Sequence, residues 1–336
     1  MSPERAGIVD EFLARAGWGQ ARREALPGDA SFRRYHRLYK CERRALLMDA
    51  PPDKEDVRPY VMIARLLARL GFSAPAILAE APARGLLVIE DFGDDTYTRL
   101  LARGQDEAAL YQLAVDVLID LRQRFQPADG AGVPPYDDER LLTEASLLTD
   151  WFLPAATGRA TQADPRLEYL ALWRDLLPLA RAVPETLVLR DYHIDNLMLL
   201  TGRTGTASCG VLDFQDAVIG PASYDLVSLL EDARRDIAPD LVASMYRRYE
   251  AAFPRADRDA FAASYAAMGA QRNAKIIGIF TRLCVRDGKR GYLGHIPRVW
   301  RLLEGDLRHP ALAPMRAWFD RNVPAALRAV PRSLAA

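Results

Sequence analysis

The segment from residue 187 to residue 200, LVLRDYHIDNLMLL, places a polar loop between two apolar runs that both suit buried strands. The loop runs from Asp191 to Asn196, and a Gly-containing turn then leads to a second apolar stretch that ends at Asp213. A strand, a turn and a returning strand bring the two open ends of a hairpin close together. We therefore expect Asp191, Asn196 and Asp213 to converge at one place in the fold.

These three side chains match the needs of phosphoryl transfer. Asn196 and Asp213 offer the amide and carboxylate oxygens that Mg²⁺ prefers, and we predict them as metal ligands. Asp191, at the start of the loop, is predicted to orient an attacking hydroxyl group and accept its proton. Taken singly, each residue could instead cap a turn, which is the ordinary role of Asn and Asp in loops. The three in this order favour a catalytic site.

Strand patterns fill the first quarter of the chain and helical periodicity dominates the rest. Residues 4–16 and 55–70 are predicted helices, with three strands between them and two more in 76–95. After residue 95 the predicted helices cover 97–125, 139–152, 165–182, 223–235, 238–252, 258–285 and 296–305. This order predicts an α+β protein with a small β-rich N-lobe, residues 1–92, and a larger, mainly helical C-lobe, residues 93–336.

Composition excludes several classes of protein. The 336 residues carry 45 basic and 45 acidic side chains, so no net field attracts nucleic acid or an anionic membrane. The sequence has neither a signal-peptide pattern nor an apolar run long enough to span a membrane. Cys41, Cys209 and Cys284 lack the spacing of a disulfide framework or a zinc site. We expect a cytoplasmic protein, active as a monomer, that binds neither nucleic acid nor membrane.

The motif region resembles a known family. Arg-Asp-x-x-x-x-Asn at 190–196, followed by a hairpin and Asp213-Phe214, is similar to the catalytic and metal-binding motifs of protein kinases. The similarity is closer to the aminoglycoside phosphotransferase and choline kinase-like family, whose later motif is present as LDFQDAVIGPASYDL, residues 212–226. The segments GDASFRRYHRL, LLMDAPP, VIEDFGDDTY and GIFTRLCVRDGKRGYL resemble the bacterial cell-wall sugar kinases within that family. The resemblance extends from about Asp29 to Arg298.

The resemblance implies a protein-kinase-like bilobal fold and an ATP- and Mg²⁺-dependent kinase. Its substrate would be the anomeric (C1) hydroxyl of N-acetylmuramate, N-acetylglucosamine or both, in cell-wall recycling. Asp191 resembles the catalytic base, and Asp225 resembles a buried aspartate that braces the catalytic loop. The residues that would contact ATP are the phosphate-covering loop and the backbone that receives adenine: Gly28, Asp29, Ala30, Ser31, Glu90 and Phe92.

The sequence departs from the kinase pattern at the residue that holds the ATP phosphates. Met48 stands where kinases place a lysine that pairs with an acid on the following helix. Lysine occurs at only four positions in the chain, so an anion will ordinarily meet arginine here. Either the backbone of the phosphate-covering loop suffices or one of four nearby arginines replaces the lysine; we predict Arg34 or Arg44 from the set Arg33, Arg34, Arg43 and Arg44.

The residues that would recognise the acceptor are less well defined. His193 follows the catalytic loop's aspartate, and Gln271, Arg272 and Asn273 lie in a predicted helix; we predict that these four contact the sugar. Arginine would suit a lactyl carboxylate. The alternatives are that His193 packs in the loop and that the helix simply exposes a basic face to solvent. A His193–Asp195 metal pair lacks further ligands nearby.

Three other functions stay open. Acidic residues after 226 could bind a cationic aminoglycoside, and a choline kinase would need an aromatic cage for the quaternary ammonium group. Met48 also permits a nucleotide-binding pseudokinase. A protein kinase is disfavoured because no Ala-Pro-Glu anchor follows Asp213.

Overall fold

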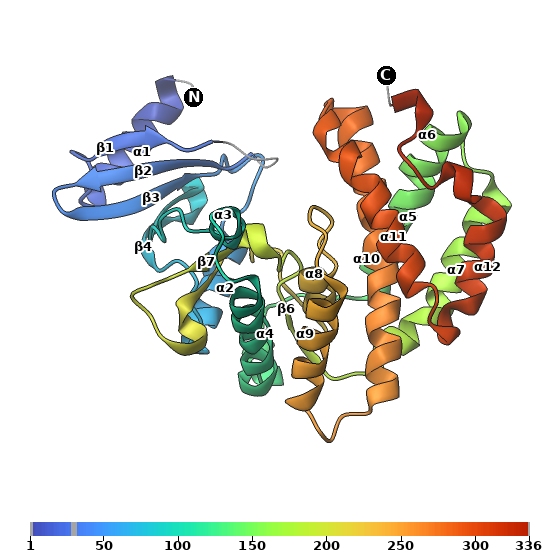
Figure 1. The fold of residues 1–336 in the computed structure, drawn as a ribbon. Coiled ribbons are helices and arrows are strands. Elements are labelled where there is room, and N and C mark those ends of the chain that lie inside the picture. The colour runs from blue at the N-terminus through green and yellow to red at the C-terminus, as the bar shows by residue number, and fades with distance from the viewer. Residues whose placement is uncertain (1–2, 28–31, 335–336) are drawn as a thin grey trace. The chain divides into compact units, whose positions relative to one another are not determined.

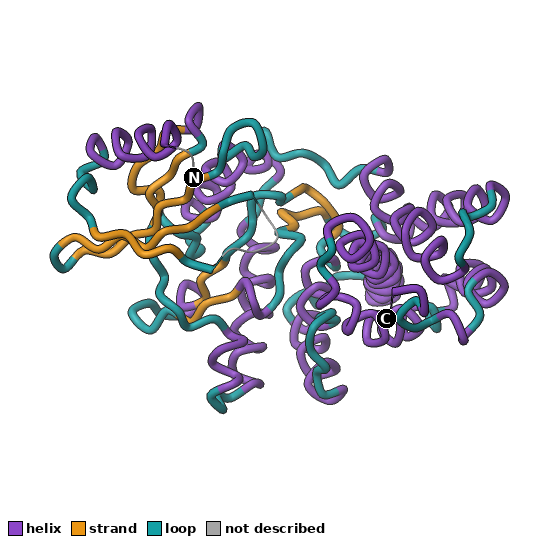
Figure 2. The backbone as a smooth tube through the Cα atoms, turned by 90° about the horizontal axis from the view of Figure 1, so that it is seen from above, coloured by secondary structure: helices purple, strands orange, loops and turns teal. Residues whose placement is uncertain are grey.

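The computed structural model describes residues 3–27 and 32–334. It divides the chain into two compact units that alternate along the sequence. The sheet unit comprises residues 1–120 and 194–217, and the helical unit comprises residues 121–193 and 218–336. Figure 1 colours the chain by residue number and Figure 2 by secondary structure. The predicted lobe boundary between residues 92 and 93 stays a prediction.

A five-stranded antiparallel sheet, in the order β1-β2-β3-β5-β4, forms the centre of the sheet unit (Figure 1). All five strands predicted for the first 95 residues are present. Their bounds are β1 (Arg22–Ala25), β2 (Arg34–Lys40), β3 (Arg43–Asp49), β4 (Ile77–Ala81) and β5 (Leu86–Ile89).

Helix α1 (Pro3–Arg15) covers one face of this sheet, as the apolar periodicity of its sequence predicts. Its buried side chains and Trp18 pack against alternate strand residues, among them Ala45 and Leu47 of β3. Because successive strand residues point to opposite faces, Leu46 and Met48 are directed to the other side of the sheet. That side carries the candidate site.

The rest of the sheet unit consists of three helical segments and a short hairpin. The helices are α2 (Arg58–Arg69), α3 (Tyr97–Ala102) and most of α4 (Glu107–Arg124). The hairpin pairs β7 (Leu197–Leu199) with β8 (Cys209–Val211), as predicted. Gly210 lies against the ring of Phe92: a Cβ at this position would be 2.8 Å from the ring, so only glycine fits.

The helical unit is built around the 30-residue helix α10 (Arg258–Asp287), which packs against α5, α7, α8 and α11 (Figure 1). The surrounding helices are α5 (Asp138–Leu147), α6 (Leu153–Thr157), α7 (Ala163–Ala180), α8 (Tyr224–Leu230), α9 (Pro239–Ala251), α11 (Ile296–Asp306) and α12 (Ala313–Asn322). A two-stranded antiparallel sheet joins β6 (Glu185–Val188) to β9 (Val218–Pro221). The helix predicted at 139–152 changes to a π-helical turn at Leu148–Phe152.

The close approach of α10 to α5 requires a glycine. A Cβ on Gly278 would lie 2.3 Å from the carbonyl carbon of Leu147, well inside any permitted contact. Within the described ranges, no helix combines the length and the apolar character needed to cross a membrane.

Candidate functional site

A cavity of about 330 Å³ lies in the sheet unit, between the sheet and the β7–β8 hairpin. Its apolar walls include Leu46 of β3, Ile89 of β5 and Met198 of β7. Its polar lining includes Asn196 and Asp213, so the structure brings two of the three predicted catalytic-site residues together.

The hairpin itself sets the positions of Asn196 and Asp213. Asn196 directly precedes β7, and the backbone N–H of Leu212 donates to the Asn196 carbonyl oxygen at 2.9 Å. Asp213 adopts a left-handed backbone conformation with φ of 56°. Its side chain is 43% exposed, and Gln215 Nε2 donates to Asp213 Oδ1 at 2.9 Å. An amide and a partly exposed carboxylate in one cavity are donors that fit Mg²⁺.

The backbone at the end of β5 is the segment predicted to receive adenine, and Glu90 and Phe92 of this segment line the cavity. The N–H of Glu90 donates to the Ala76 carbonyl oxygen at 2.9 Å, and its carboxylate accepts from Arg203 at 2.5 Å. In 3–27 and 32–334, no hydrogen bond uses the Glu90 carbonyl or the Phe92 N–H. Both residues line the cavity, and their contact with adenine stays a prediction.

The segment after β5 is held by an arginine and two aspartates. Arg37 of β2 pairs with Asp91 at 2.7 Å and with Asp94 at 3.1 Å. The side chains of Arg37 and Asp91 are almost fully buried, and burial favours a rigid, fully bonded pair over a mobile one. These ion pairs fix the backbone of the segment that contains Glu90 and Phe92.

The predicted phosphate-binding arginines lie elsewhere. Arg44 pairs with Asp91 at 2.8 Å and lines an adjoining cavity of about 550 Å³, which shares residues 90–94 with the first. Arg34 is exposed at the start of β2, opposite Asp49. Neither lines the cavity that contains Asn196 and Asp213. The predicted phosphate-covering residues Gly28, Asp29, Ala30 and Ser31 lie outside the described residues.

Asp191 belongs to the helical unit, where it follows β6 and is exposed. The preceding backbone is fixed by Asp225 of α8, whose carboxylate accepts the N–H groups of Leu189 at 2.6 Å and Arg190 at 2.9 Å. Burial raises the pKa of Asp225 to about 7, against the opposing effect of these two donors. The predicted bracing role of Asp225 is confirmed. Because Asn196 and Asp213 belong to the sheet unit, their convergence with Asp191 stays a prediction.

A second brace on this loop was not predicted from the sequence. Arg190 has a φ of 70°, and its guanidinium forms an ion pair with Glu144 of α5. The same carboxylate pairs with Lys275 of α10 at 3.2 Å and accepts a hydrogen bond from Tyr136. Burial opposes ionisation of Glu144, but Lys275 and Arg190 outweigh it and lower its pKa. An ionised Glu144 therefore joins the loop to two helices.

We expect Glu144→Gln to destabilise the protein by about 3 kcal/mol at pH 7, because it leaves two buried cations without their shared carboxylate. A lowered pKa means that this stabilisation is present above about pH 4.5, the usual value for Glu, and is lost as pH falls through the folded-state pKa. Thermal unfolding of both proteins at pH 7 and pH 4 measures this difference. The difference in Tm between the unchanged protein and Glu144→Gln should be smaller at pH 4 than at pH 7.

Glu139→Gln is the matched control, since Glu139 lies on the same helix and is exposed. Its effect should stay within about 0.5 kcal/mol. Equal changes in Tm for Glu144→Gln and Glu139→Gln would contradict the stabilising role of the Glu144 ion pairs.

The predicted acceptor residues are mostly buried in the helical unit. His193 is 6% exposed and lies 3.4 Å from Arg234 Nη1; burial, together with Arg234, lowers its pKa. Gln271 and Asn273 are fully buried, and Gln271 donates to the Leu141 carbonyl oxygen. Arg272, 5% exposed, donates to the Glu231 carbonyl oxygen at 3.1 Å. These contacts give the four residues roles inside the unit, and a sugar contact stays a prediction.

The acids after residue 226 are compensated by neighbouring groups. Glu231 accepts from Asn273 at 2.7 Å, and Asn273 also donates to Asp306 at 2.9 Å. Asp236 pairs with Arg298 and Arg301 at 2.8 and 3.0 Å. Four acids and four arginines line the cavity of about 530 Å³ here, so its wall carries no large excess of negative charge.

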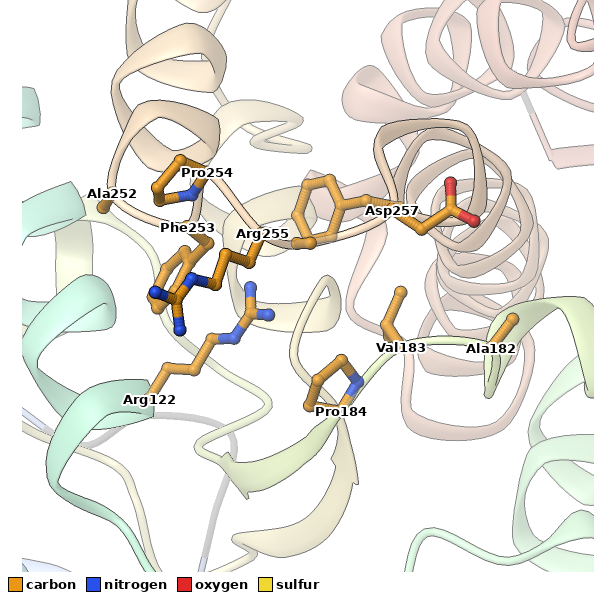
Figure 3. Close-up of a pocket in the computed structure, with 11 residues that line it drawn as sticks. Arg122, Ala182, Val183, Pro184, Ala252, Phe253, Pro254, Arg255 and Asp257 are labelled. Atoms are coloured by element: carbon orange, nitrogen blue, oxygen red, sulfur yellow. The ribbon is translucent and has the colours of Figure 1, made fainter.

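The helical unit also has a cavity of about 610 Å³ between the start of β6 and the α9–α10 loop (Figure 3). Arg122 lies over the ring of Phe253 at 3.8 Å, and Val183 and Pro184 form part of the wall. None of the residues predicted for the site lines this cavity, so we assign the site to the cavity with Asn196 and Asp213.

The fold is that of kinases related to choline and aminoglycoside kinases. A choline/ethanolamine kinase family protein from Mesorhizobium loti superposes with a TM-score of 0.60 at 14% identity, covering 94% of this chain and 98% of that one. The streptomycin–ATP–APH(2'')-IIa ternary complex gives a TM-score of 0.56 at 14% identity, with 82% and 90% covered. These similarities establish the α+β kinase-like fold.

Residues 22–263 match the model described as the phosphotransferase enzyme family, and the chain belongs to that family. It is 40% identical to the N-acetylmuramate/N-acetylglucosamine kinase of Caulobacter vibrioides, over 98% of this chain and 99% of that protein. It is also 40% identical to the kinase of the same name from Pseudomonas aeruginosa, over 91% of each.

Proposed function

We propose that this phosphotransferase uses ATP to phosphorylate the anomeric hydroxyl of N-acetylmuramate, N-acetylglucosamine or both, in cell-wall sugar recycling. The observation that carries the proposal is the identity of 40% with an N-acetylmuramate/N-acetylglucosamine kinase over 98% of the chain. The cavity that contains the predicted metal ligands supports the phosphotransfer part. We also propose that the enzyme acts as a monomer and that it is located in the cytoplasm, where ATP is available.

Each part of the site has a task in this reaction. The backbone of Glu90 and Phe92 binds the adenine edge, and the apolar walls of the cavity pack against its faces. Asn196 and Asp213 would hold Mg²⁺, which would neutralise charge on the phosphates of ATP. Asp191 orients the sugar hydroxyl. As the hydroxyl oxygen bonds to the γ-phosphorus, the bond from that phosphorus to ADP breaks and the hydroxyl proton passes to Asp191.

The charge distribution of the helical unit disfavours a cationic acceptor. Asp236 is paired with two arginines, and the cavity lined by the acids of this unit has as many arginines as acids in its wall. An aminoglycoside carries several ammonium groups and would need uncompensated carboxylates. A neutral or singly anionic sugar needs no such carboxylates.

A substrate panel tests the proposal. The purified protein is incubated with labelled ATP, Mg²⁺ and either N-acetylmuramate, N-acetylglucosamine, choline or kanamycin. The 1-O-methyl glycosides of both sugars serve as matched controls because their anomeric oxygen carries no proton. We expect label on one or both sugars and none on the methyl glycosides.

Each other result would contradict a defined part of the proposal. Equal transfer to the methyl glycosides would exclude the anomeric hydroxyl as the acceptor. Transfer to kanamycin or choline alone would assign the chain to one of those kinase types. Nucleotide binding with no transfer to any acceptor would support a pseudokinase.

A further inference from the structure

The position of the usual ATP-binding lysine cannot serve that purpose in this chain. Met48 is fully buried in β3, where it lies opposite Tyr35 of β2 and Leu87 of β5. In the kinase arrangement a lysine at this place pairs with an acid of the following helix and binds the phosphates. A thioether has no charge with which to do either.

Arg33, just before β2, pairs with an acid close to α2 and with one of the two predicted metal ligands. Its Nε lies 3.0 Å from Glu55 Oε2, shortly before α2, and its Nη1 lies 3.6 Å from Asp213 Oδ1. The Arg33 side chain is only 12% exposed. Glu55 also accepts the N–H of Phe32 at 3.1 Å, so one carboxylate fixes both the backbone and the guanidinium here.

The other arginines considered for this role contact other groups or are exposed to solvent. Arg37 and Arg44 pair with Asp91, and Arg43 lies over the ring of Trp18 at 4.8 Å. Arg34 is exposed at the edge of the strand. Arg33 forms an ion pair with Asp213.

We propose that Arg33 replaces the missing lysine and binds the α- and β-phosphates of ATP, with Glu55 positioning its guanidinium. This inference rests on the proposed function only for the identity of the nucleotide. A guanidinium is a suitable substitute because its planar fork forms paired hydrogen bonds to phosphate oxygens. An arginine side chain stays cationic throughout the physiological pH range.

The test compares Arg33→Gln with Arg34→Gln, which changes the neighbouring exposed arginine in the same way. Isothermal titration calorimetry measures the Kd of Mg·ADP, Mg·ATP and adenosine for each variant. For Arg33→Gln we expect a Kd for both Mg·nucleotides at least about tenfold higher, with adenosine affinity unchanged because adenosine has no phosphate. Arg33→Lys should recover part of the loss, and Arg34→Gln should stay within about twofold of the unchanged protein.

Two results would overturn the inference. One is equal nucleotide affinity for Arg33→Gln and Arg34→Gln. The other is an equal loss of adenosine and Mg·ADP affinity, which would mean that the substitution distorts the cavity. Thermal unfolding without nucleotide checks that Arg33→Gln is folded.

The binding readout separates this inference from the sugar assignment. If the unchanged protein phosphorylates no sugar but binds Mg·ADP, the proposed function fails. The comparison of Arg33→Gln with Arg34→Gln still shows whether Arg33 binds the phosphates of the nucleotide. If activity on a sugar is found, Arg33→Gln should raise the KM for ATP by about tenfold and leave the KM for the sugar within about twofold. An unchanged KM for ATP would count against Arg33.

Discussion

Asp191→Asn is expected to lower kcat by about 10³-fold while the Kd of Mg·ATP stays within about twofold. The amide has nearly the same shape as the carboxylate but cannot accept the proton of the sugar hydroxyl. The loop should keep its conformation, because the groups that fix it are the Leu189 and Arg190 N–H groups and the Asp225 carboxylate. Single-turnover phosphorylation of the sugar and calorimetric ATP binding measure the two quantities.

Asp195→Asn is the matched control for this experiment. Asp195 lies in the same loop and accepts a hydrogen bond from Thr98, but we assign it no chemical role. Its kcat should fall by less than about fivefold. A turnover rate for Asp191→Asn close to that of Asp195→Asn would remove Asp191 as the base.

Asp213→Asn is expected to abolish measurable turnover and to weaken Mg·ATP binding by about 100-fold, since it removes the one predicted metal ligand that carries a charge. The substitution retains a side chain that can bond to Gln215, so the hairpin should remain intact. Calorimetry with and without Mg²⁺ is the direct measurement. Adding Mg²⁺ should strengthen ATP binding in the unchanged protein and have little effect in the variant.

Asp216→Asn provides the comparison, because Asp216 is exposed three residues further along the chain. It should keep the Mg²⁺ dependence of ATP binding. If Asp213→Asn retains that dependence as well, Asp213 is not a metal ligand and another side chain must be sought in the cavity.

Local patterns predicted the parts of the site that lie next to each other in the sequence. The apolar runs on either side of a glycine-containing turn identify the β7–β8 hairpin, and a hairpin necessarily brings Asn196 and Asp213 together. The five strands and helix α1 follow from alternation and helical periodicity over short windows. Each of these predictions depends on neighbours within about 20 residues.

Partners distant in the sequence were not predictable in this way. Glu144 lies 46 positions from Arg190 and 131 from Lys275, and its own helix looks like any amphipathic helix. Arg33 and Arg34 are adjacent and chemically identical. Which one reaches Asp213 depends on where β2 begins, and helix or strand ends are the least certain feature of a sequence pattern.

The polar residues of α10 show the same limit. Gln271 and Asn273 could be taken as binding residues because polar groups in an apolar helix need a partner. Their partners are the Leu141 carbonyl and the carboxylates of Glu231 and Asp306, which come from three separate segments of the chain. A sequence shows that such a group needs a partner but not which segment supplies it.

The pairing of Arg190 with Glu144 has a consequence for control of this enzyme. In many protein kinases, a phosphate group is added to the activation segment. Arginines form ion pairs with this phosphate, and these ion pairs stabilise the active conformation. Here the countercharge is encoded in the chain and is present as soon as the protein has folded. The charge that holds this arginine therefore requires no later modification of the chain.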